Sequence, residues 1–326
     1  MALTIEDIAK LSGTSKSTVS RYLNNGSVSK KTRERIKQVI NETGFELNVS
    51  ASRLKRNKSN LVGVLFEGFE SISVQRMLSG VNRTLKDLGY LPFIMMDEVD
   101  EEDRIQNVRA LVNQGVDGII YGAGQLTAEH IQYLSKTDVP VLLVGQEVDY
   151  IPSKKIDDYQ AGYKLGNYLS QSHYEKVVLL TRPETDKAIG IERKNGFLDG
   201  IRSVHAPGEI QVIPSSFSIE DNYKLAEGIW QYQPDLIVGS TDRMIMGIVQ
   251  YLNEQKISIP QQVAVAGFGN YEYGKFLSPP LTSVNIDYCS LGQEAAKSIV
   301  QLIEEQKLPD QSKHYSMEVI PRGSTK

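Results

Sequence analysis

Four polar side chains near the N-terminus have the chemistry and the spacing of a nucleic-acid reader. They are Lys16, Ser17, Thr18 and Arg21, and all fall on the polar side of one short segment. Side chains of these types reach base edges in the major groove or fix the register on phosphates. We expect Lys16 and Ser17 to contact bases and Arg21 to reach a guanine or a phosphate. The plain alternative is a solvated helix with incidental charges.

Two short helices joined by a tight turn must position these side chains. Thr4 and Asp7 form a capping-box-like start for the first helix, Gly13 makes the turn, and Ser15 can cap the second helix. The inward faces are predicted to be Ile5, Ile8, Ala9 and Leu11 in the first helix and Val19, Tyr22 and Leu23 in the second. This arrangement predicts a helix-turn-helix, whose second helix lies in the major groove of DNA.

A third helix and a basic segment complete this head. The helix is predicted for residues 30–42, with Ser29 as its N-cap, Gly44 at its end, and an inner face of Ile36, Val39 and Ile40. Residues 48–58 are basic and helix-competent but too short to form a stable helix alone. We therefore expect them to fold against DNA and a second copy, with Leu54 as a wedge in the minor groove. A solvated linker is the alternative.

The charge distribution indicates a polyanionic partner for the head. Residues 1–58 carry twelve Lys/Arg against five Asp/Glu, whereas the whole chain of 326 residues has a net charge of −4. A small basic head on a large acidic body is typical of a head that binds a polyanion such as DNA.

Residues 1–58 resemble the headpiece of the LacI/GalR family of bacterial repressors, and the similarity continues along nearly the whole chain. The matching stretches are Thr4-Ile-Glu-Asp-Ile-Ala, Ser17-Thr-Val-Ser-Arg-Tyr-Leu-Asn, Val28-Ser-Lys-Lys-Thr-Arg, Gly44-Phe-Glu-Leu-Asn48 and Ala51-Ser-Arg-Leu54. The resemblance implies paired hinge helices that insert a leucine, here Leu54, into the centre of a palindromic operator. The sequence departs at Leu47, where the family commonly has proline, and we expect this to loosen the hinge helix without abolishing it.

The predicted DNA contacts combine the polar groups of the head with those that the resemblance implies. They are Ile5, Ser15, Lys16, Ser17, Thr18, Arg21, Asn24, Ser29, Asn48, Ala51 and Leu54. The short hydrogen-bonding side chains Ser15, Asn24 and Ser29 suit phosphate oxygens.

After residue 59 short apolar runs alternate with amphipathic helical stretches. Strands are predicted at 61–66, 91–96, 118–121, 139–144, 177–181, 210–213, 236–239, 263–268 and 282–286. Helices are predicted at 74–88, 101–114, 126–134, 191–203, 219–231, 243–254 and 291–305. This alternation predicts an α/β body with two doubly wound parallel sheets, a two-lobed body like that of periplasmic binding proteins.

We expect three parts along the chain. They are a helix-turn-helix headpiece at 1–47, a hinge helix or linker at 48–58, and an effector-binding and dimerisation body at 59–326. Within the body, an N-lobe takes 59–158 and 288–321 and a C-lobe takes 159–287, because the last helix and a strand near 317–321 are predicted to return to the first block. Two crossings between the lobes make a clamshell that hinges over a ligand.

Composition and motifs exclude several classes of protein. The polar N-terminus lacks a signal peptide, and no apolar run approaches the ~20 residues of a membrane helix. Cys289 is the only cysteine, which fits a reducing cytoplasm, and the four histidines lack metal-ligand spacing. Gly122-Ala-Gly124 lacks the third glycine of a nucleotide fingerprint, and no Gly-x-Ser-x-Gly elbow occurs. We predict a cytoplasmic protein that is no enzyme and binds neither metal nor cofactor.

Polar and aromatic residues just beyond the strand ends are the candidate ligand site, because open α/β sheets bind ligands there. They are Glu67, Phe69, Gln146, Asp157 with Asp158, Arg193, Phe217, Thr241, Asp242 and Asn270. Planar polar groups that chelate hydroxyls, with a ring against the apolar sugar face, are typical of sugar sites. The resemblance also implies ligand contacts at Arg193, Thr241, Asp242, near Asn270 and at Phe217. For each residue the alternative role is capping of a strand or helix end.

The resemblance narrows the ligand. Val144-Gly-Gln-Glu, Asp157-Asp-Tyr-Gln-Ala-Gly162 and Gly269-Asn-Tyr-Glu-Tyr are similar to sugar regulators of Gram-positive bacteria that include sucrose-operon repressors. Trehalose-type relatives, similar around Val74-Gln-Arg-Met-Leu78, recognise a sugar phosphate through extra arginines, but this chain has Gly68 and Gly145 at those places. We therefore favour an unphosphorylated sugar, sucrose or a related di- or oligosaccharide.

The predicted function is a homodimeric, sugar-responsive transcriptional repressor that binds a palindromic operator. Closure of the lobes on the sugar would separate the hinge pair and release DNA, and the absence of leucine heptads near the C-terminus predicts a dimer without a tetramerising tail. Alternatives are a regulator that responds to a sugar phosphate or a phosphocarrier protein, or to a nucleobase or nucleoside. An exported solute-binding protein is disfavoured by the missing signal peptide, and an enzyme with an accessory DNA domain has no motif to support it.

Overall fold

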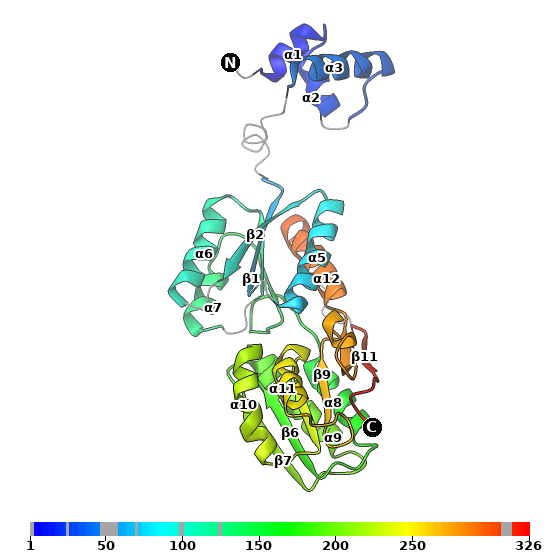
Figure 1. The fold of residues 1–326 in the computed structure, drawn as a ribbon. Helices are drawn as coiled ribbons and strands as arrows, with labels where there is room; N and C mark the ends of the chain where they lie inside the picture. Colours follow the sequence, from blue (N-terminus) through cyan, green and yellow to red (C-terminus); the bar gives the residue numbers. More distant parts are fainter. Residues whose placement is uncertain are drawn as a thin grey trace. The chain divides into compact units, whose positions relative to one another are not determined.

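The computed structural model describes residues 3–23, 26–45, 58–68, 71–97, 101–122, 126–307 and 315–326 (Figure 1). The chain forms two compact units, Met1–Ser59 and Asn60–Lys326, which we call the head and the body.

In the described residues of the head lie three capped helices: α1 (Ile5–Leu11), α2 (Lys16–Leu23) and α3 (Lys30–Thr43). The Thr4 hydroxyl accepts a hydrogen bond from the Asp7 N–H, and the Asp7 carboxylate accepts one from the Thr4 N–H at 2.9 Å, so the predicted capping box is present. The hydroxyls of Ser15 and Ser29 each accept from the N–H three residues later. Gly44 ends α3 at a φ of 62°, in the left-handed region. The helix starts and the helix end predicted for the head are confirmed.

A small apolar core holds the three helices together. Ile8, Val19 and Ile36, one from each helix, are fully buried, with Phe45 beside them. The prediction that Leu11 faces this core is wrong, because its side chain is 58% exposed. Ser12 is buried instead, because it lies four residues after Ile8 and therefore on the same, buried side of α1. Leu11, one residue earlier, points about 100° away from Ser12 around the helix axis.

The first sheet of the body is parallel throughout, with strand order β2-β1-β3-β4-β5. Its strands are β1 (Leu61–Glu67), β2 (Leu91–Asp97), β3 (Gly118–Gly122), β4 (Val141–Val144) and β5 (Ser153–Lys154). The helices of this lobe, the N-lobe, are α5 (Ile72–Asp87), α6 (Glu101–Asn113), α7 (Ala128–Ser135) and the distant α12 (Tyr288–Glu305), which packs beside α5 (Figure 1). The central strands are apolar along their length because both faces of the sheet are covered.

The second sheet has the order β11-β10-β9-β8-β6-β7 and forms the C-lobe. Its strands are β6 (Lys176–Thr181), β7 (Glu209–Pro214), β8 (Leu236–Gly239), β9 (Ala264–Phe268), β10 (Thr282–Ile286) and β11 (Met317–Ile320). Its helices are α8 (Asp158–Leu169), the π-helix η1 (Lys187–Arg193), α9 (Lys194–Ile201), α10 (Ile219–Gln231), α11 (Asp242–Glu254) and the short 3-10 helix η2 (Glu272–Lys275). The predicted α/β body with two wound, largely parallel sheets is confirmed.

The last strand corrects the predicted path of the chain. β11 pairs antiparallel with β10, so it lies in the C-lobe and does not return to the first block. The final helix α12 does return to the N-lobe, where it packs on α5. The chain therefore passes between the lobes three times rather than twice: before α8, before α12, and between α12 and β11.

Glycines let helices α8 and α9 of the C-lobe approach each other backbone to backbone. A Cβ at Gly162 of α8 would overlap the carbonyl oxygen of Arg193, and one at Gly196 of α9 would overlap the carbonyl of Tyr159. Gly166 and Gly200 make the same close approach one turn further along. This contact fixes the start of α9, and with it Arg193, against α8.

We expect Gly162→Ala to lower the free energy of unfolding by about 1–3 kcal/mol, because backbone rather than a flexible side chain must move aside. Gly228→Ala in α10 is the matched control, since a Cβ there meets nothing within 4 Å. That change should stabilise the helix by about 0.5–1 kcal/mol. Urea unfolding followed by circular dichroism measures both, and equal effects of the two substitutions would show that the α8–α9 contact yields easily.

Candidate DNA-binding surface and effector cleft

The second helix of the head displays three of the predicted DNA-reading side chains. Lys16, Ser17 and Arg21 are exposed on α2, whereas Thr18 is half-buried. The hydroxyl of Ser15 lies 2.8 Å from those of both Ser17 and Thr18, so these short side chains form one hydrogen-bonded group at the helix start. The first turn of α2 contains no acidic residue. A helix N-terminus of this kind attracts phosphate oxygens, as the prediction for this surface requires.

The other predicted DNA contacts fall into two groups. Ser29 is exposed and caps α3, while Ile5 is half-buried against the head core. The remaining four, Asn24, Asn48, Ala51 and Leu54, lie outside the described residues.

Arg193 is the best-anchored of the predicted effector residues. It ends the π-helix η1, and its side chain is only 3% exposed. Its Nε donates to Asp158 at 2.9 Å, and its Nη2 also donates to that carboxylate. Nη1 donates to the carbonyl of Ser240 at 2.7 Å, and Nη2 lies 3.5 Å from the Tyr288 hydroxyl. Within the described part of the chain, four of the five guanidinium N–H groups thus have acceptors, and one N–H on Nη1 has none.

The partners of Arg193 place it at two of the crossings between the lobes. Asp158 is the first residue of α8, just after the first crossing, and Tyr288 is the first residue of α12, just after the second. Burial raises the pKa of Asp158, and the charge of Arg193 opposes this rise. A buried carboxylate and guanidinium are tolerable only as a pair, so each depends on the other.

Thr241 and Asp242 have clear structural roles beside this pair. The Thr241 hydroxyl caps α11. Asp242 is fully buried and accepts hydrogen bonds from the Tyr271 N–H at 2.8 Å and from the Ser283 hydroxyl at 2.6 Å. One carboxylate oxygen of Asp242 thus holds the loop that follows β9, and the other accepts from a hydroxyl on β10. For Asp242 these bonds favour a structural role over direct contact with a ligand.

The burial of Asp242 should make stability depend on pH. Burial raises its pKa from 3.8 to about 6, although the Ser283 hydroxyl acts against this. The folded state therefore binds the proton more tightly than the unfolded state, and the free energy of unfolding should fall as pH rises from about 4 to 6. Asp242→Asn keeps an acceptor for the Tyr271 N–H and should remove up to about 3 kcal/mol of this dependence.

Urea unfolding of the Asp242→Asn variant between pH 4 and 7 tests this expectation. Asp157→Asn is the control, because asparagine caps a helix as well as aspartate does. Parallel pH profiles for wild type and Asp242→Asn would show that Asp242 does not titrate differently on unfolding.

Asn270 and Phe217 complete the polar and aromatic groups of the C-lobe. Asn270 has a φ of 46°, its Nδ2 donates to Asn285 at 3.1 Å, and its Oδ1 accepts from Arg322. Phe217 is 39% exposed, and the guanidinium carbon of Arg182 lies 4.6 Å from its ring centroid. One ring face is thereby covered by a cation, and the exposed remainder can stack on a sugar.

The N-lobe contributes fewer of the predicted ligand residues. Glu67 ends β1 and forms an ion pair with the buried Arg104 of α6, with Nη2 and Oε1 2.5 Å apart. Gln146 is half-buried just after β4. Asp157 is exposed and caps α8 through the Gln160 N–H. Phe69 lies outside the described residues.

The structure links most of the C-lobe candidates and adds residues that the sequence did not single out. Arg193 binds the carbonyl of Ser240 next to Thr241, and Asp242 and Asn270 share the Ser283 hydroxyl. The added residues are Arg104, Arg182, Ser240 and Tyr288, and the predicted Asp158 gains a role as the partner of Arg193. Among the described residues, the buried Ser240 hydroxyl has no hydrogen-bond partner, which suits it to a ligand hydroxyl.

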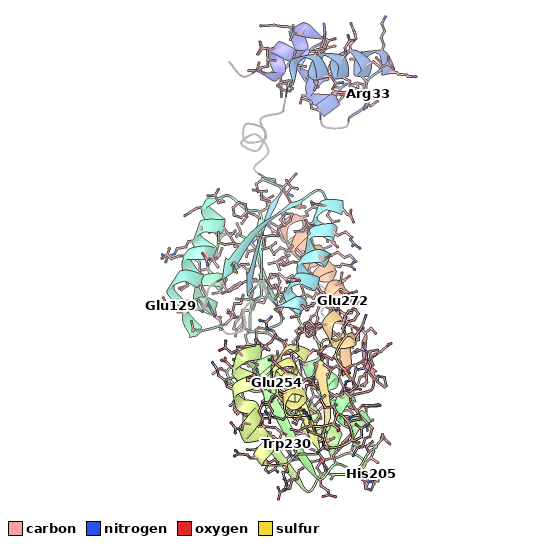
Figure 2. All side chains as sticks on the ribbon, viewed as in Figure 1. Arg33, Glu129, His205, Trp230, Glu254 and Glu272 are labelled. Atoms are coloured by element: carbon pink, nitrogen blue, oxygen red, sulfur yellow. The ribbon has the colours of Figure 1, made fainter. Side chains whose placement is uncertain are left out.

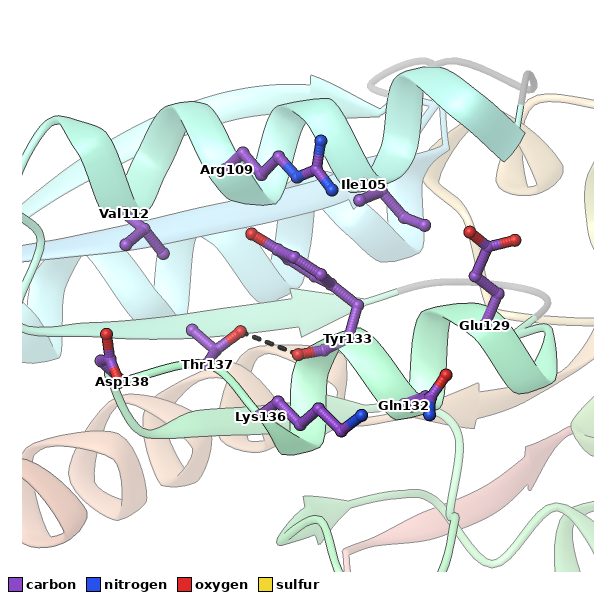
Figure 3. Close-up of a pocket in the computed structure, with 9 residues that line it drawn as sticks. All are labelled: Ile105, Arg109, Val112, Glu129, Gln132, Tyr133, Lys136, Thr137 and Asp138. Atoms are coloured by element: carbon purple, nitrogen blue, oxygen red, sulfur yellow. Dashed lines mark hydrogen bonds between the residues drawn. The ribbon is translucent and has the colours of Figure 1, made fainter.

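A groove on the outer side of the N-lobe is separate from these residues. It has a volume of about 400 Å³ and lies between α6 and α7, with Tyr133 and Arg109 facing each other across it (Figure 3). None of the predicted effector residues lines it. In the part of the chain that the structure describes, no three His, Cys, Asp or Glu side chains gather as metal ligands would, and no helix is long and apolar enough to span a membrane.

Comparison with known proteins decides the family. Residues 61–321 match the periplasmic binding proteins and sugar binding domain of the LacI family, and residues 4–48 match the bacterial regulatory proteins of the lacI family. The chain belongs to the LacI family. This LacI-family protein is therefore a transcriptional regulator rather than an enzyme, and the resemblance noted in the sequence is confirmed.

Individual relatives extend over nearly the whole LacI-family chain. The sucrose operon repressor of Staphylococcus xylosus is 32% identical over 303 residues, which cover 93% of this chain and 94% of that protein. The regulator TreR of Salmonella typhimurium is 28% identical over 92% of this chain and 94% of its own. A crystal structure of the lac repressor dimer bound to operator and an anti-inducer shares the fold, with a TM-score of 0.86, 23% identity, and coverage of 100% and 99%.

Proposed function

We propose that the protein is a sugar-responsive transcriptional repressor that binds a palindromic operator as a homodimer in the cytoplasm. Sucrose or a related di- or oligosaccharide is the proposed inducer. The observation that carries this proposal is the similarity to a sucrose operon repressor over 93% of the chain, head and body together. Closure of the lobes on the sugar would part the hinge segments at 48–58 and weaken operator binding by about 5–150-fold.

The groups of the C-lobe suit a neutral sugar. Arg193 has its charge balanced by Asp158 and offers one N–H, which fits a hydroxyl better than a phosphate. The unpartnered Ser240 hydroxyl and the exposed part of the Phe217 ring add a polar contact and a stacking surface. Glu67 and Gln146 would approach from the strand ends of the N-lobe.

Exposed apolar side chains support a homodimer. Strand β2 is an edge of the N-lobe sheet, and four of its residues are exposed although large and apolar: Leu91, Phe93, Ile94 and Met96. In the C-lobe, Phe276 is 80% exposed. Such patches are usually covered by a partner, and a second copy also supplies the second head that a palindrome needs.

Operator selection tests the DNA-binding part of this proposal. The full-length protein should enrich a palindrome from random double-stranded DNA, and sedimentation of the complex should give two chains per site. Enrichment of a single half-site, or of no sequence, would contradict the proposed homodimeric repressor.

A sugar phosphate is the second candidate effector, because Arg182 and Arg243 both contact Phe217. Arg182 covers its ring, and Arg243 Nε donates to its carbonyl at 3.1 Å. Titration calorimetry with sucrose and with sucrose 6-phosphate separates the candidates. Calorimetry is preferable to fluorescence because Trp230, the only tryptophan, lies on α10 and packs against the C-lobe core (Figure 2). Tighter binding of the phosphate would replace the neutral sugar by the phosphorylated one.

A further inference from the structure

One side chain of the N-lobe holds three consecutive residues of the C-lobe. Arg76 lies on the second turn of α5, and its Nη1 donates to the carbonyl of Gly269 at 2.7 Å. Its Nη2 donates to the carbonyl of Asn270 at 2.9 Å. The guanidinium carbon also lies 5.6 Å from the ring centroid of Tyr271. Both ends of one planar guanidinium are thus bound to the loop that follows β9.

This loop has a backbone that needs support. Gly269 has a φ of 120° and Asn270 a φ of 46°, both outside the region that most side chains allow. Its three amides donate to C-lobe acceptors: Gly269 to the Val284 carbonyl, Asn270 to the Ser283 hydroxyl, and Tyr271 to the Asp242 carboxylate. The amides hold the loop from the C-lobe, and Arg76 holds its carbonyls from the N-lobe.

A second residue of α5 contacts the same loop. Burial raises the pKa of the Tyr271 hydroxyl, and the hydroxyl of Ser73, one turn before Arg76 on α5, acts against this rise. Arg76 also lies close enough to act electrostatically on Asp242, the carboxylate that anchors the Tyr271 amide. The first turns of α5 therefore contact a loop that contains Asn270 and is anchored on Asp242, and both are among the predicted effector residues.

We propose that Arg76 is a positioning residue that couples the predicted effector residues of the C-lobe to α5, by bridging the carbonyls of Gly269 and Asn270 across the two lobes. This proposal rests on the proposed function, because it states how the binding of a sugar to the body would be transmitted to α5. A sugar that shifts the 269–271 loop moves α5 through two hydrogen bonds and a cation–π contact. α5 in turn packs along α12, so the shift spreads through the N-lobe.

Hydrogen exchange of the full-length protein tests the bridge without any ligand. In Arg76→Ala, the amides of 269–271 should exchange about tenfold faster or more, because the loop loses two bonds from a charged donor. Arg83→Ala, at an exposed position of the same helix, removes the same charge and should exchange as wild type does. Unchanged exchange at 269–271 in Arg76→Ala would overturn the bridge.

Operator release by sucrose tests the coupling. With a palindromic operator selected from random DNA, Arg76→Ala should bind sucrose in the calorimeter yet lose at least about fivefold of the sucrose-induced fall in operator affinity. Arg76→Lys replaces the planar guanidinium, which donates to both carbonyls, by a single ammonium group. It should therefore recover only part of the sucrose-induced fall in operator affinity. A residue of purely structural importance would lower the melting temperature and leave the release ratio unchanged, and that result contradicts the proposal. If wild type does not respond to sucrose, the proposed inducer fails while the exchange result still decides the bridge.

Discussion

Asp158→Ala should lower the free energy of unfolding of the body by about 3–5 kcal/mol, because it leaves the buried Arg193 guanidinium without its counter-charge. Arg193 and Asp158 are both almost fully buried, and two guanidinium nitrogens donate to the same carboxylate oxygen. Sugar binding should fall at least about tenfold in any protein that still folds, since Arg193 loses its fixed orientation. Urea unfolding and titration calorimetry measure the two effects.

The neighbouring Asp157→Ala is the matched control. Asp157 is exposed and caps α8 through the Gln160 N–H, so its loss should cost about 0.5–2 kcal/mol and weaken sugar binding much less than the loss of Asp158 does. If Asp157→Ala proved as damaging as Asp158→Ala, the ion pair would not be what holds Arg193.

Lys16→Ala should weaken specific operator binding by about 2–6 kcal/mol per dimer, at least roughly 30-fold. Each lost base contact costs about 1–3 kcal/mol, and a symmetric dimer loses two. Lys16 is exposed in the first turn of α2, 3.6 Å from Glu6, in a weak surface ion pair that DNA can replace. Fluorescence anisotropy on the selected operator and on random DNA measures the change in specificity.

Lys10→Ala controls for the loss of positive charge. Lys10 is exposed near the end of α1, so its removal should weaken binding to both DNAs by a similar, small factor. Equal losses for Lys10→Ala and Lys16→Ala would mean that α2 does not read the bases.

The head was largely predictable because its signals are local. Capping residues such as Thr4 and Ser29 act within three positions of themselves, and Gly44 adopts the left-handed conformation that favours glycine. The prediction for Leu11 was wrong because the apolar character of a side chain alone does not determine toward which side of the helix it points. Helical spacing from Ile8 points to Ser12, a polar residue that satisfies its hydroxyl on the Ile8 carbonyl at 2.7 Å.

The positions of the strands in the body could be predicted from the sequence, but the sheet to which the last strand, β11, belongs could not. Buried strands such as β1 and β8 can be recognised in the sequence because they consist almost entirely of apolar residues and glycine. The four residues of β11 fit the edge of either sheet, and only the β10 partners decide which. The pairing of two strands that are far apart in the sequence cannot be recognised from the residues of either strand alone.

The sequence indicates which residues lie near the strand ends, but not which side chains they contact. Strand-end reasoning selected Arg193, Thr241 and Asn270 as candidates, because the carboxyl ends of parallel strands converge. It could not show that Asp158, rather than the adjacent Asp157, turns inward. Nor could it show that Arg76 crosses from the other lobe, since these contacts join residues 35 and 193 positions apart.

Operator binding with and without sucrose shows directly whether the protein is a repressor that sugar releases from DNA. Fluorescence anisotropy of the full-length protein on its selected palindrome should show tight, specific binding that weakens about 5–150-fold when sucrose is added, and not when an unrelated sugar alcohol is added. Specific binding that sucrose leaves unchanged or strengthens would contradict the account of a sucrose-released repressor.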